Sequence, residues 1–452
     1  MTVLSACSLE KLLRPDGFSC SCGRRHKAAV RSLFTGEGAI RRIPETLEEL
    51  GLRRPMLLCG PYGYEAAGQA VRTVLQEYGI PFGLYVIRPG GTGRLKPDEQ
   101  AVGSACLHFD HSCDCVLAVG SGVINDVGKV VSKTADRPLL TVATAPSMDG
   151  YASDNASMEV EGIKLSLPEQ MPAAVFCDIR ILSQAPPRMI RAGLGDILAK
   201  TTALCDWKLS HLVTGEYYCA SVAALAERSL RKTLAFAPAL DRDRTEAVSA
   251  ITEGLLLSGL AIAFAGSSHP ASGLEHYFSH CWEMMCLERG REYELHGIQV
   301  GVGTLLTLRL AEALKEVRPE MARVEAAAAR FDGQAWEANL RRVFPRASKD
   351  LLSMEKRVMK NAREGRLRRA ERAIEHWDEV KAVLAALPSA AETEKQMRAL
   401  GMPVRVEEIG MTAADAADAF VCSRDIRDKY LLSSLIWDLG YMDDFVPLVR
   451  DT

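Results

Sequence analysis

The first 180 residues alternate short apolar runs with helical segments, and this alternation constrains the fold more than any other feature of the chain. Each run is bounded by glycine, proline or charged residues, as buried strands are. Strand, helix, strand in succession requires crossover connections and a mainly parallel sheet. We therefore predict strands at Pro55–Cys59, Phe82–Ile87, Cys115–Val119, Leu139–Thr144 and Ala174–Asp178, with helices at Tyr64–Tyr78 and Val123–Ser132.

The pattern changes after Pro186-Pro187, because almost everything that follows has helical periodicity and few strand signals. At ~150 residues per domain, a chain of 452 residues favours two or three domains. We predict an α/β domain with a Rossmann-like parallel sheet over residues 1–185 and an all-α helical domain over residues 186–452. A cleft between two such domains is the usual place for a ligand.

The charged residues nearly balance, with 55 lysines and arginines against 58 aspartates and glutamates, for a formal net charge of −3. Nucleic-acid binding needs a surplus of positive charge, so we expect no nucleic acid as a partner. Residues 1–13 contain no long apolar run, which predicts no secretion signal and reduced, cytoplasmic cysteines. The longest apolar stretch, Gly254–Ala265, is too short and too interrupted to cross a bilayer, so we expect no membrane association.

A glycine-rich segment, Gly120–Ile124 (GSGVI), follows a predicted strand and opens a predicted helix. Such glycines let the backbone approach a pyrophosphate, which the N-terminus of the helix attracts. Asn125 takes the place of the third glycine of the dinucleotide-binding pattern. Spacing alone therefore fits a plain strand-to-helix turn equally well.

A polar segment, Thr144–Ser153, leaves the next predicted strand at the same edge of the sheet, where ligands of open parallel sheets bind. The hydroxyls of Thr144, Ser147 and Ser153 could hold a nucleotide, and the carboxylate of Asp149 could accept a bond from a sugar or polyol. A polar loop shaped by its proline and glycine is the alternative.

Four of the nine histidines fall between residues 269 and 296. His276 and His280 are four apart and would share one face of a helix, and His296 could reach the same point. Asp196, after a Gly-Leu-Gly segment that we interpret as a turn before a helix, could add a carboxylate. One carboxylate and two imidazoles leave a coordination position open, as catalytic metal sites require. Packing and capping roles, including an N-cap role for Asp196, are the alternative.

Cys20, Cys22 and His26 form a C-x-C-x-x-x-H pattern. Structural zinc sites take four ligands, and no second cysteine pair lies nearby in the sequence. We therefore favour a structural turn over a zinc site. The chain has no G-x-S-x-G, Walker A or H-E-x-x-H motif, which argues against a serine hydrolase, a P-loop kinase and a zincin.

Taken together, these segments resemble the sn-glycerol-1-phosphate dehydrogenases, especially their bacterial branch, within the superfamily of iron-type alcohol dehydrogenases, glycerol dehydrogenase and dehydroquinate synthase. The resemblance implies a dehydroquinate synthase-like fold, NAD or NADP, one divalent metal (zinc, nickel or iron) and a homodimer or larger homo-oligomer. The segments, in family order, are Cys20–His26, VGSGVINDVGK, TVATAPSMDGYAS, GLGDILAK, GSSHPASGLEHYFSH and ELHGIQVGVGT.

The resemblance also implies roles for individual residues. Metal ligands carry over to Asp196, His276 and His296, and substrate contacts with catalytic roles to Asp149, Asp196 and His280. Cofactor contacts carry over to Gly120, Ser121, Gly122, Val123, Ile124, Thr144, Ala145, Pro146, Ser147 and Ser153.

Two positions depart from the family pattern. Gly60 stands where bacterial relatives usually carry an acidic residue that would bind the adenosine ribose, so the sequence leaves NAD and NADP both open. His269 stands where relatives usually carry arginine, whose permanent guanidinium suits a phosphate better than imidazole does. Ser267 and Ser268 are further candidates for contacts with a substrate phosphate.

The resemblance predicts the interconversion of dihydroxyacetone phosphate and sn-glycerol 1-phosphate with NAD(P)H. The metal would polarise the C2 carbonyl, the nicotinamide would deliver a hydride, and His280 or a metal-bound water would supply the proton. A dehydroquinate-synthase-like lyase, which returns its nucleotide unchanged, and a non-catalytic nucleotide-binding descendant are the alternatives.

Overall fold

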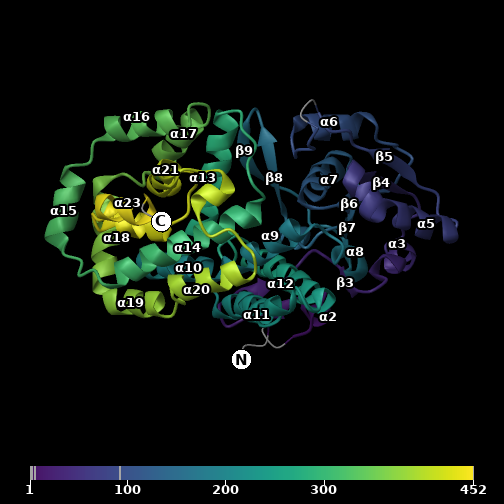
Figure 1. Cartoon of the computed structure of the whole chain (residues 1–452), viewed down its shortest axis with the longest axis horizontal. Coiled ribbons are helices and arrows are strands. Elements are labelled where there is room, and N and C mark those ends of the chain that lie inside the picture. The colour runs from purple at the N-terminus through teal and green to yellow at the C-terminus, as the bar shows by residue number, and fades with distance from the viewer. Residues whose placement is uncertain (1–3, 5–6, 91–92, 451–452) are drawn as a thin grey trace. The chain divides into compact units, whose positions relative to one another are not determined.

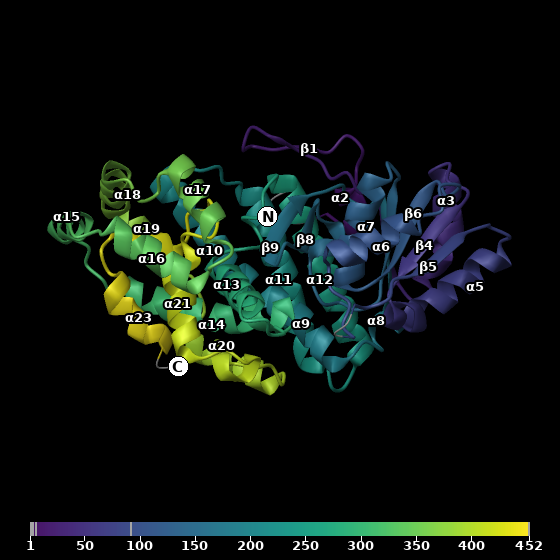
Figure 2. The ribbon, with the colours of Figure 1, turned by 90° about the horizontal axis from the view of Figure 1, so that it is seen from above.

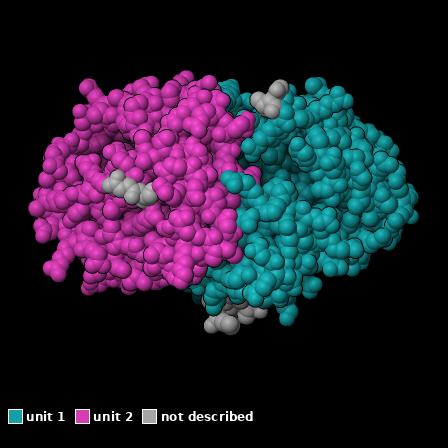
Figure 3. Space-filling model, viewed as in Figure 1, with its two compact units in different colours: residues 1–197, 220–267 teal, residues 198–219, 268–452 magenta. Residues whose placement is uncertain are grey.

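The computed structural model describes residues 4, 7–90 and 93–450. Part of the segment on which the secretion prediction rests lies outside these residues. The chain packs into two compact units (Figure 3): unit 1 comprises residues 1–197 and 220–267, and unit 2 comprises residues 198–219 and 268–452. Unit 1 contains the sheet, and unit 2 is helical.

A six-stranded parallel sheet lies at the centre of unit 1 (Figure 1). Its order is β3-β10-β7-β6-β4-β5, and every neighbouring pair is parallel. This confirms the predicted α/β fold with a parallel sheet. The strands are β3 (Ser32–Gly36), β4 (Pro55–Cys59), β5 (Gly83–Val86), β6 (Cys115–Gly120), β7 (Leu139–Ala143) and β10 (Ala174–Asp178).

Short hairpins and helices make up the rest of unit 1. The hairpins are β1 (Phe18–Ser19) with β2 (Arg25–His26), and β8 (Asn155–Val160) with β9 (Ile163–Pro168). The helices are α2 (Leu9–Leu12), η1 (Ala39–Arg42), α3 (Ile43–Glu49), α4 (Pro61–Gly63), η2 (Tyr64–Gly68), α5 (Gln69–Glu77), α6 (Glu99–Leu107), α7 (Gly122–Thr134), η3 (Gly150–Ala152), α8 (Ile179–Leu182), α9 (Pro187–Leu198), α11 (Ala220–Phe236), η4 (Ala237–Ala239) and α12 (Arg244–Ala265).

Helices cover both faces of the sheet (Figure 2). Alternate residues of a strand point to opposite faces. Leu57 of β4 and Leu117 of β6 therefore pack in one core cluster with α3 and α5, whereas Met56 and Val116 pack in the other with α6 and α7. Burial on both sides explains why the central strands read as continuous apolar runs.

Helix α12 is long and apolar enough, by length and composition alone, to span a membrane. It begins ten residues before the apolar stretch Gly254–Ala265. In the structure, however, 83% of its most apolar 18-residue window is buried inside the protein. Its apolar side chains therefore form part of the hydrophobic core.

Unit 2 contains helices and, within the described residues, no strand. Helices α13 and α14 pack against each other and carry the predicted histidines. The helices are α10 (Lys200–Thr214), α13 (Leu274–Glu288), α14 (His296–Lys315), α15 (Met321–Ala329), α16 (Gly333–Val343), α17 (Ser348–Val358), α18 (Arg363–Glu375), α19 (Trp377–Ala385), α20 (Ala390–Ala399), η5 (Val406–Ile409), α21 (Ala413–Ser423), α22 (Leu432–Asp438) and α23 (Met442–Arg450).

The two units are defined by the contacts within the folded chain, whereas the predicted domain boundary near residue 185 rests on a change of pattern in the sequence. Most of α9 and all of α11 and α12 belong to the unit with the sheet. The division of the chain into domains of residues 1–185 and 186–452 stays a prediction.

Candidate active site

The glycine-rich segment forms a tight turn between β6 and α7, as its pattern predicts. Strand β6 ends at Gly120, Ser121 is the N-cap residue, and α7 begins at Gly122. A Cβ atom on Gly120 would lie 2.5 Å from Cβ of Ile124, so no larger residue fits there without a shift. The first amides of α7 have no acceptor within the helix. They form a positively polarised end that suits a pyrophosphate.

The segment Thr144–Ser153 leaves β7 beside this turn. The amide of Thr144 donates to the carbonyl of Gly120 (3.1 Å), which ties the two segments together. The hydroxyls of Thr144, Ser147 and Ser153 are largely buried in unit 1. Both groups of predicted cofactor contacts therefore lie at the carboxyl ends of β6 and β7.

Lys129 of α7, which the sequence analysis did not single out, fixes the far end of this segment. Its ammonium group donates to the carbonyls of Gly150 (2.7 Å) and Asn155 (2.8 Å) and to the hydroxyl of Ser153 (3.1 Å). Burial lowers the pKa of Lys129, and the neighbouring carboxylate of Asp126 opposes that shift. A lysine in an amphipathic helix usually faces water, so only the fold reveals this role.

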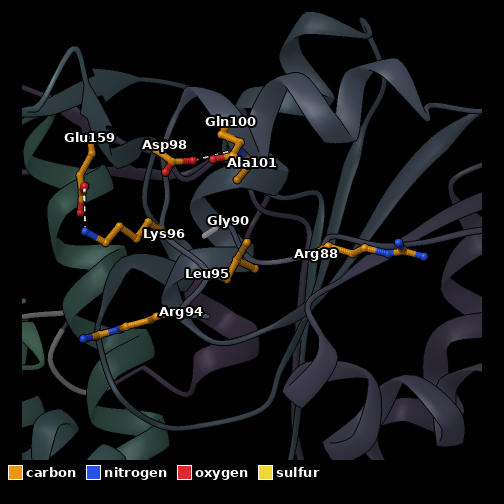
Figure 4. A pocket seen from close by; sticks show the side chains of 9 residues that line it. All are labelled: Arg88, Gly90, Arg94, Leu95, Lys96, Asp98, Gln100, Ala101 and Glu159. Atoms are coloured by element: carbon orange, nitrogen blue, oxygen red, sulfur yellow. Dashed lines mark hydrogen bonds and ion pairs between the residues drawn. The ribbon is translucent and has the colours of Figure 1, made fainter. Parts of the chain in front are cut away.

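The loops after β4 and β5 meet at Gly60. A Cβ atom on Gly60 would lie 3.0 Å from Cδ2 of Leu95 and 3.6 Å from Cδ1 of Ile124. Leu95 also lines a pocket with several basic residues (Figure 4). The lining residues are Arg88, Gly90, Arg94, Leu95, Lys96, Asp98, Gln100, Ala101 and Glu159, and Lys96 forms an ion pair with Glu159 (3.8 Å).

Asp149 and Asp196 are adjacent in unit 1. The amide of Asp149 donates to Oδ2 of Asp196 (2.9 Å), and the hydroxyl of Ser258 on α12 donates to Oδ2 of Asp149 (2.7 Å). Asp196 is 1% exposed. The structure thus brings together the two predicted catalytic carboxylates of this unit.

Asp196 is not at a helix start, contrary to our interpretation of the Gly-Leu-Gly segment as a turn. It lies in the last turn of α9, which begins at Pro187, so it is not an N-cap residue. A Cβ atom on Gly193 would lie 1.9 Å from the carbonyl oxygen of Pro146. The glycine is needed for close packing of α9 against the loop rather than for a turn.

The three histidines predicted in unit 2 converge. His276 and His280 lie on α13, and His296 is the first residue of α14. The ring centres of His276 and His296 are 5.2 Å apart, and those of His280 and His296 are 5.4 Å apart. Two residues predicted as metal ligands and one predicted as a substrate contact therefore face one another.

Glu275 orients His276. Its Oε1 accepts a hydrogen bond from Nδ1 of His276 (2.8 Å), and its carboxylate also accepts bonds from Thr202 and the amide of Gly273, both 2.6 Å. Burial opposes ionisation of Glu275, but these bonds outweigh it and hold the pKa below its ordinary value. A carboxylate that accepts from Nδ1 fixes the ring orientation and tautomer of His276, as the carboxylate partners of metal-bound histidines do.

Glu283 is a second carboxylate that the sequence analysis missed. Its Oε1 lies 3.1 Å from Nδ1 of His296, and its Oε2 lies 3.8 Å from Nδ1 of His280. Potential ligand atoms of these three residues lie within 4.8 Å of one another. Burial lowers the pKa of His280 well below its ordinary value, and the positive charge of Arg427 adds to the effect.

His269, the second departure, pairs with an acid. Its Nε2 lies 3.0 Å from Oε1 of Glu216. Burial raises the pKa of Glu216, but the hydrogen bonds from His269 and Ser210, together with the nearby charges of His269 and Lys429, outweigh this effect and the net shift is downward. The ring of His269 therefore has a carboxylate partner.

Comparison with known proteins identifies the family. Residues 34–186 match the iron-containing alcohol dehydrogenases. The chain is 36% identical over 301 residues to a glycerol-1-phosphate dehydrogenase [NAD(P)+] of Halalkalibacterium halodurans, covering 66% of this chain and 75% of that one. The chain belongs to the glycerol-1-phosphate dehydrogenase family.

Other members of this family come from archaea. The glycerol-1-phosphate dehydrogenase [NAD(P)+] of Pyrococcus furiosus is 35% identical over 279 residues, which cover 61% of this chain and 77% of that one. Among solved structures, glycerol dehydrogenase from Schizosaccharomyces pombe superimposes with a TM-score of 0.60 at 14% identity, covering 93% and 91% of the two chains. At that identity the superposition shows the shared fold alone.

Proposed function

We propose that this protein is an NAD(P)H-dependent, metal-dependent sn-glycerol-1-phosphate dehydrogenase that interconverts dihydroxyacetone phosphate and sn-glycerol 1-phosphate. The observation that carries the proposal is the convergence of three imidazoles, in a chain 36% identical to a glycerol-1-phosphate dehydrogenase. Dehydroquinate-synthase-like lyase activity and a non-catalytic role are outcomes that the test below would reveal.

We assign the metal to Asp196, His276 and His296. These residues supply one carboxylate oxygen and two imidazole nitrogens, which suit zinc, nickel or iron. The donor set fits a metal, since Glu275 accepts a hydrogen bond from Nδ1 of His276 and so orients the ring as carboxylates orient metal-bound histidines. When bound, the metal supplies a Lewis acid for the C2 carbonyl and NAD(P)H supplies the hydride.

We assign NAD(P) to the residues at the carboxyl ends of β6 and β7. The amides at the start of α7 would bind the pyrophosphate, and Lys129 holds the second segment in place. The contact residues in this proposal are Gly120, Ser121, Gly122, Val123, Ile124, Thr144, Ala145, Pro146, Ser147 and Ser153.

We assign the substrate to the polar groups of Asp149, Asp196 and His280. Ser258 fixes the carboxylate of Asp149, which can then accept a bond from a substrate hydroxyl. The proton required at the C2 oxygen would come from a ring nitrogen of His280 or from a water. Ser267, Ser268 and the His269–Glu216 pair are candidates for the phosphate end. A homodimer in the cytoplasm completes the proposal.

The test is the oxidation of NAD(P)H by the purified, metal-loaded protein on addition of dihydroxyacetone phosphate. Replacing His276 with alanine removes a ligand, so we expect kcat/KM to fall by about 100-fold or more. The matched control is His376→Ala, at a part-exposed histidine outside the proposed site whose Nδ1 lies 2.8 Å from Oε1 of Glu379. A metal-loaded His276→Ala protein with undiminished turnover would overturn the metal assignment.

A further inference from the structure

The N-terminal hairpin of unit 1 carries a cluster of metal-ligating side chains that the proposed function does not use. Strands β1 and β2 pair at Phe18 with His26, and the loop between them contains Cys20 and Cys22. The amide of Cys20 donates to the carbonyl of Arg24, and Gly23, with φ of 83°, turns the chain directly after Cys22. This loop places both thiols on the same side as the imidazole of His26.

The donor atoms lie close enough together for a tetrahedral zinc site. Sγ of Cys22 lies 3.4 Å from Nε2 of His26. Ligand atoms of Cys20, Cys22, His26 and Cys219 all lie within 4.8 Å of one another. Zinc–sulfur bonds of about 2.3 Å and zinc–nitrogen bonds of about 2.0 Å give a tetrahedron with edges of roughly 3.5 to 3.8 Å. Small side-chain movements would close the cluster onto one ion.

The hydrogen bond of His26 sets its ring for ligation. Nδ1 of His26 lies 2.8 Å from the carbonyl oxygen of Phe264 at the end of α12. A carbonyl can only accept, so Nδ1 must carry the proton and Nε2 keeps its lone pair. That lone pair faces the sulfur of Cys22. An imidazole held in this tautomer by a backbone carbonyl is the usual arrangement of a zinc-bound histidine.

Cys219 supplies the fourth ligand that the sequence did not reveal. It directly precedes Ala220, the first residue of α11, and this peptide bond is where the two units divide. The start of α11 therefore fixes its position, and Ser221 in the first turn hydrogen-bonds Cys20. Cys219 is 1% exposed, although it belongs to no cysteine pair in the sequence. Its distance along the chain from Cys22 is why the motif looked incomplete.

We propose that Cys20, Cys22, His26 and Cys219 bind one structural zinc ion. Three thiolates and one imidazole complete a tetrahedral coordination sphere with no position left for water or substrate. The paired segments β1 and β2 have two residues each, too few to be stable alone. Zinc would hold this hairpin against the start of α11 and the end of α12, and no part of that role depends on the dehydrogenase proposal.

The first experiment measures zinc content in the full-length protein. Wild type, Cys20→Ser and Cys22→Ser are purified under reducing conditions, dialysed against EDTA and assayed by elemental analysis. We expect one zinc per chain in the wild type and a loss of that equivalent in both variants. Cys106→Ser, at a half-buried cysteine outside the cluster, is the matched control and should retain its zinc.

A second measurement identifies the ligands without any substitution in the cluster. The proposed catalytic site contains no cysteine, so thiolate-to-cobalt charge-transfer absorption in the near ultraviolet would report this cluster alone. Cobalt-reconstituted wild-type and His276→Ala proteins should both show that absorption. A wild type without EDTA-resistant zinc, a Cys20→Ser protein that keeps it, or a cobalt protein without thiolate absorption would each overturn the proposal.

Discussion

Gly193 shows how a single missing side chain positions the candidate site. Helix α9 lies so close to the loop after β7 that a Cβ on Gly193 would fall 1.9 Å from the carbonyl oxygen of Pro146. The same helix holds Asp196 against the amide of Asp149. Any residue other than glycine must push α9 and this loop apart, and the carboxylates of Asp149 and Asp196 would move with them.

We therefore expect Gly193→Ala to lower both kcat/KM and the thermal unfolding midpoint. Overpacking of this kind costs about 1–3 kcal/mol. The matched control is Gly103→Ala in α6, where a Cβ meets nothing within 4 Å and alanine should add up to about 1 kcal/mol of stability. Measuring activity and stability for both variants distinguishes the effect of the close contact at Gly193 from the effect of the higher helix propensity of alanine. A Gly193→Ala protein as active as wild type would show that α9 can move away from the loop without affecting the site.

The residues that sequence reasoning missed are those whose burial depends on the fold. Glu275 and Glu283 are glutamates on a helix, a position that usually faces water. Both are at most 1% exposed and contact the histidines. The histidines themselves could be predicted to share a helix face from their spacing alone. Only the packing of α13 against α14 reveals which acids accompany them.

At the scale of elements, the central strands and the edge strand β5 could be predicted, whereas the edge strand β3 and the β8–β9 hairpin could not. The predicted bounds of β4 and β10 agree with the structure, since both are fully buried. Strand β3, an edge strand with partly exposed residues and a terminal glycine, was not predicted. The β8–β9 hairpin was missed as well, and β9 lacks a fully buried residue.

The loop after β4 is where we expect the nucleotide preference to be decided. Gly60 has an ordinary negative φ of −93°, so a side chain can be introduced there without backbone strain. An aspartate would favour the free ribose hydroxyl and repel a 2′-phosphate. We expect Gly60→Asp to raise KM for NADPH at least about 10-fold more than KM for NADH.

Gly60→Ala is the control for this experiment. It adds the same Cβ beside Leu95 without a charge, so it should affect the two nucleotides alike. Steady-state kinetics with both nucleotides checks the prediction. If alanine and aspartate change the ratio of KM for NADPH to KM for NADH equally, the adenosine ribose does not bind beside residue 60.

Asp206 joins two elements of unit 2, and its titration should be visible in the stability of the protein. Its carboxylate accepts bonds from the amides of Leu274 at the start of α13 (2.6 Å) and Leu432 at the start of α22 (2.8 Å). Burial raises the pKa of Asp206 to about 8, the charge of Glu275 adds to this, and the two amide bonds oppose it.

The folded protein therefore binds a proton at Asp206 that the unfolded chain releases near pH 4. Its stability contribution is complete below pH 4 and is lost as the pH rises towards 8, by up to about 1.4 kcal/mol per pH unit. The measurement is denaturant unfolding of wild type and Asp206→Asn from pH 4 to 8. We expect the unfolding free energy of the wild type, relative to that of Asp206→Asn, to fall steadily as the pH rises from 4 to 8. A difference that stays constant over this range would exclude the raised pKa.

At the scale of the whole molecule, family membership rests on relatives at 30% identity or more that the chain largely covers. The fold follows from the sheet and from solved structures of the same fold at 14–17% identity. Asp149 and Asp196 belong to unit 1, and the three converging histidines belong to unit 2. The sequence could suggest the carboxylates and the histidines separately, whereas the assignment of one metal to residues of both groups remains our proposal.

The most direct test of the central claim is the stoichiometry of the reaction with dihydroxyacetone phosphate. Metal-loaded protein is incubated with NADH or NADPH, and oxidised nucleotide and the stereochemistry of the glycerol phosphate formed are measured together. A dehydrogenase consumes one reduced nucleotide for each molecule of sn-glycerol 1-phosphate that appears, and that is the result we predict. Nucleotide that is recovered unchanged, or a product that is not sn-glycerol 1-phosphate, would contradict the proposed function.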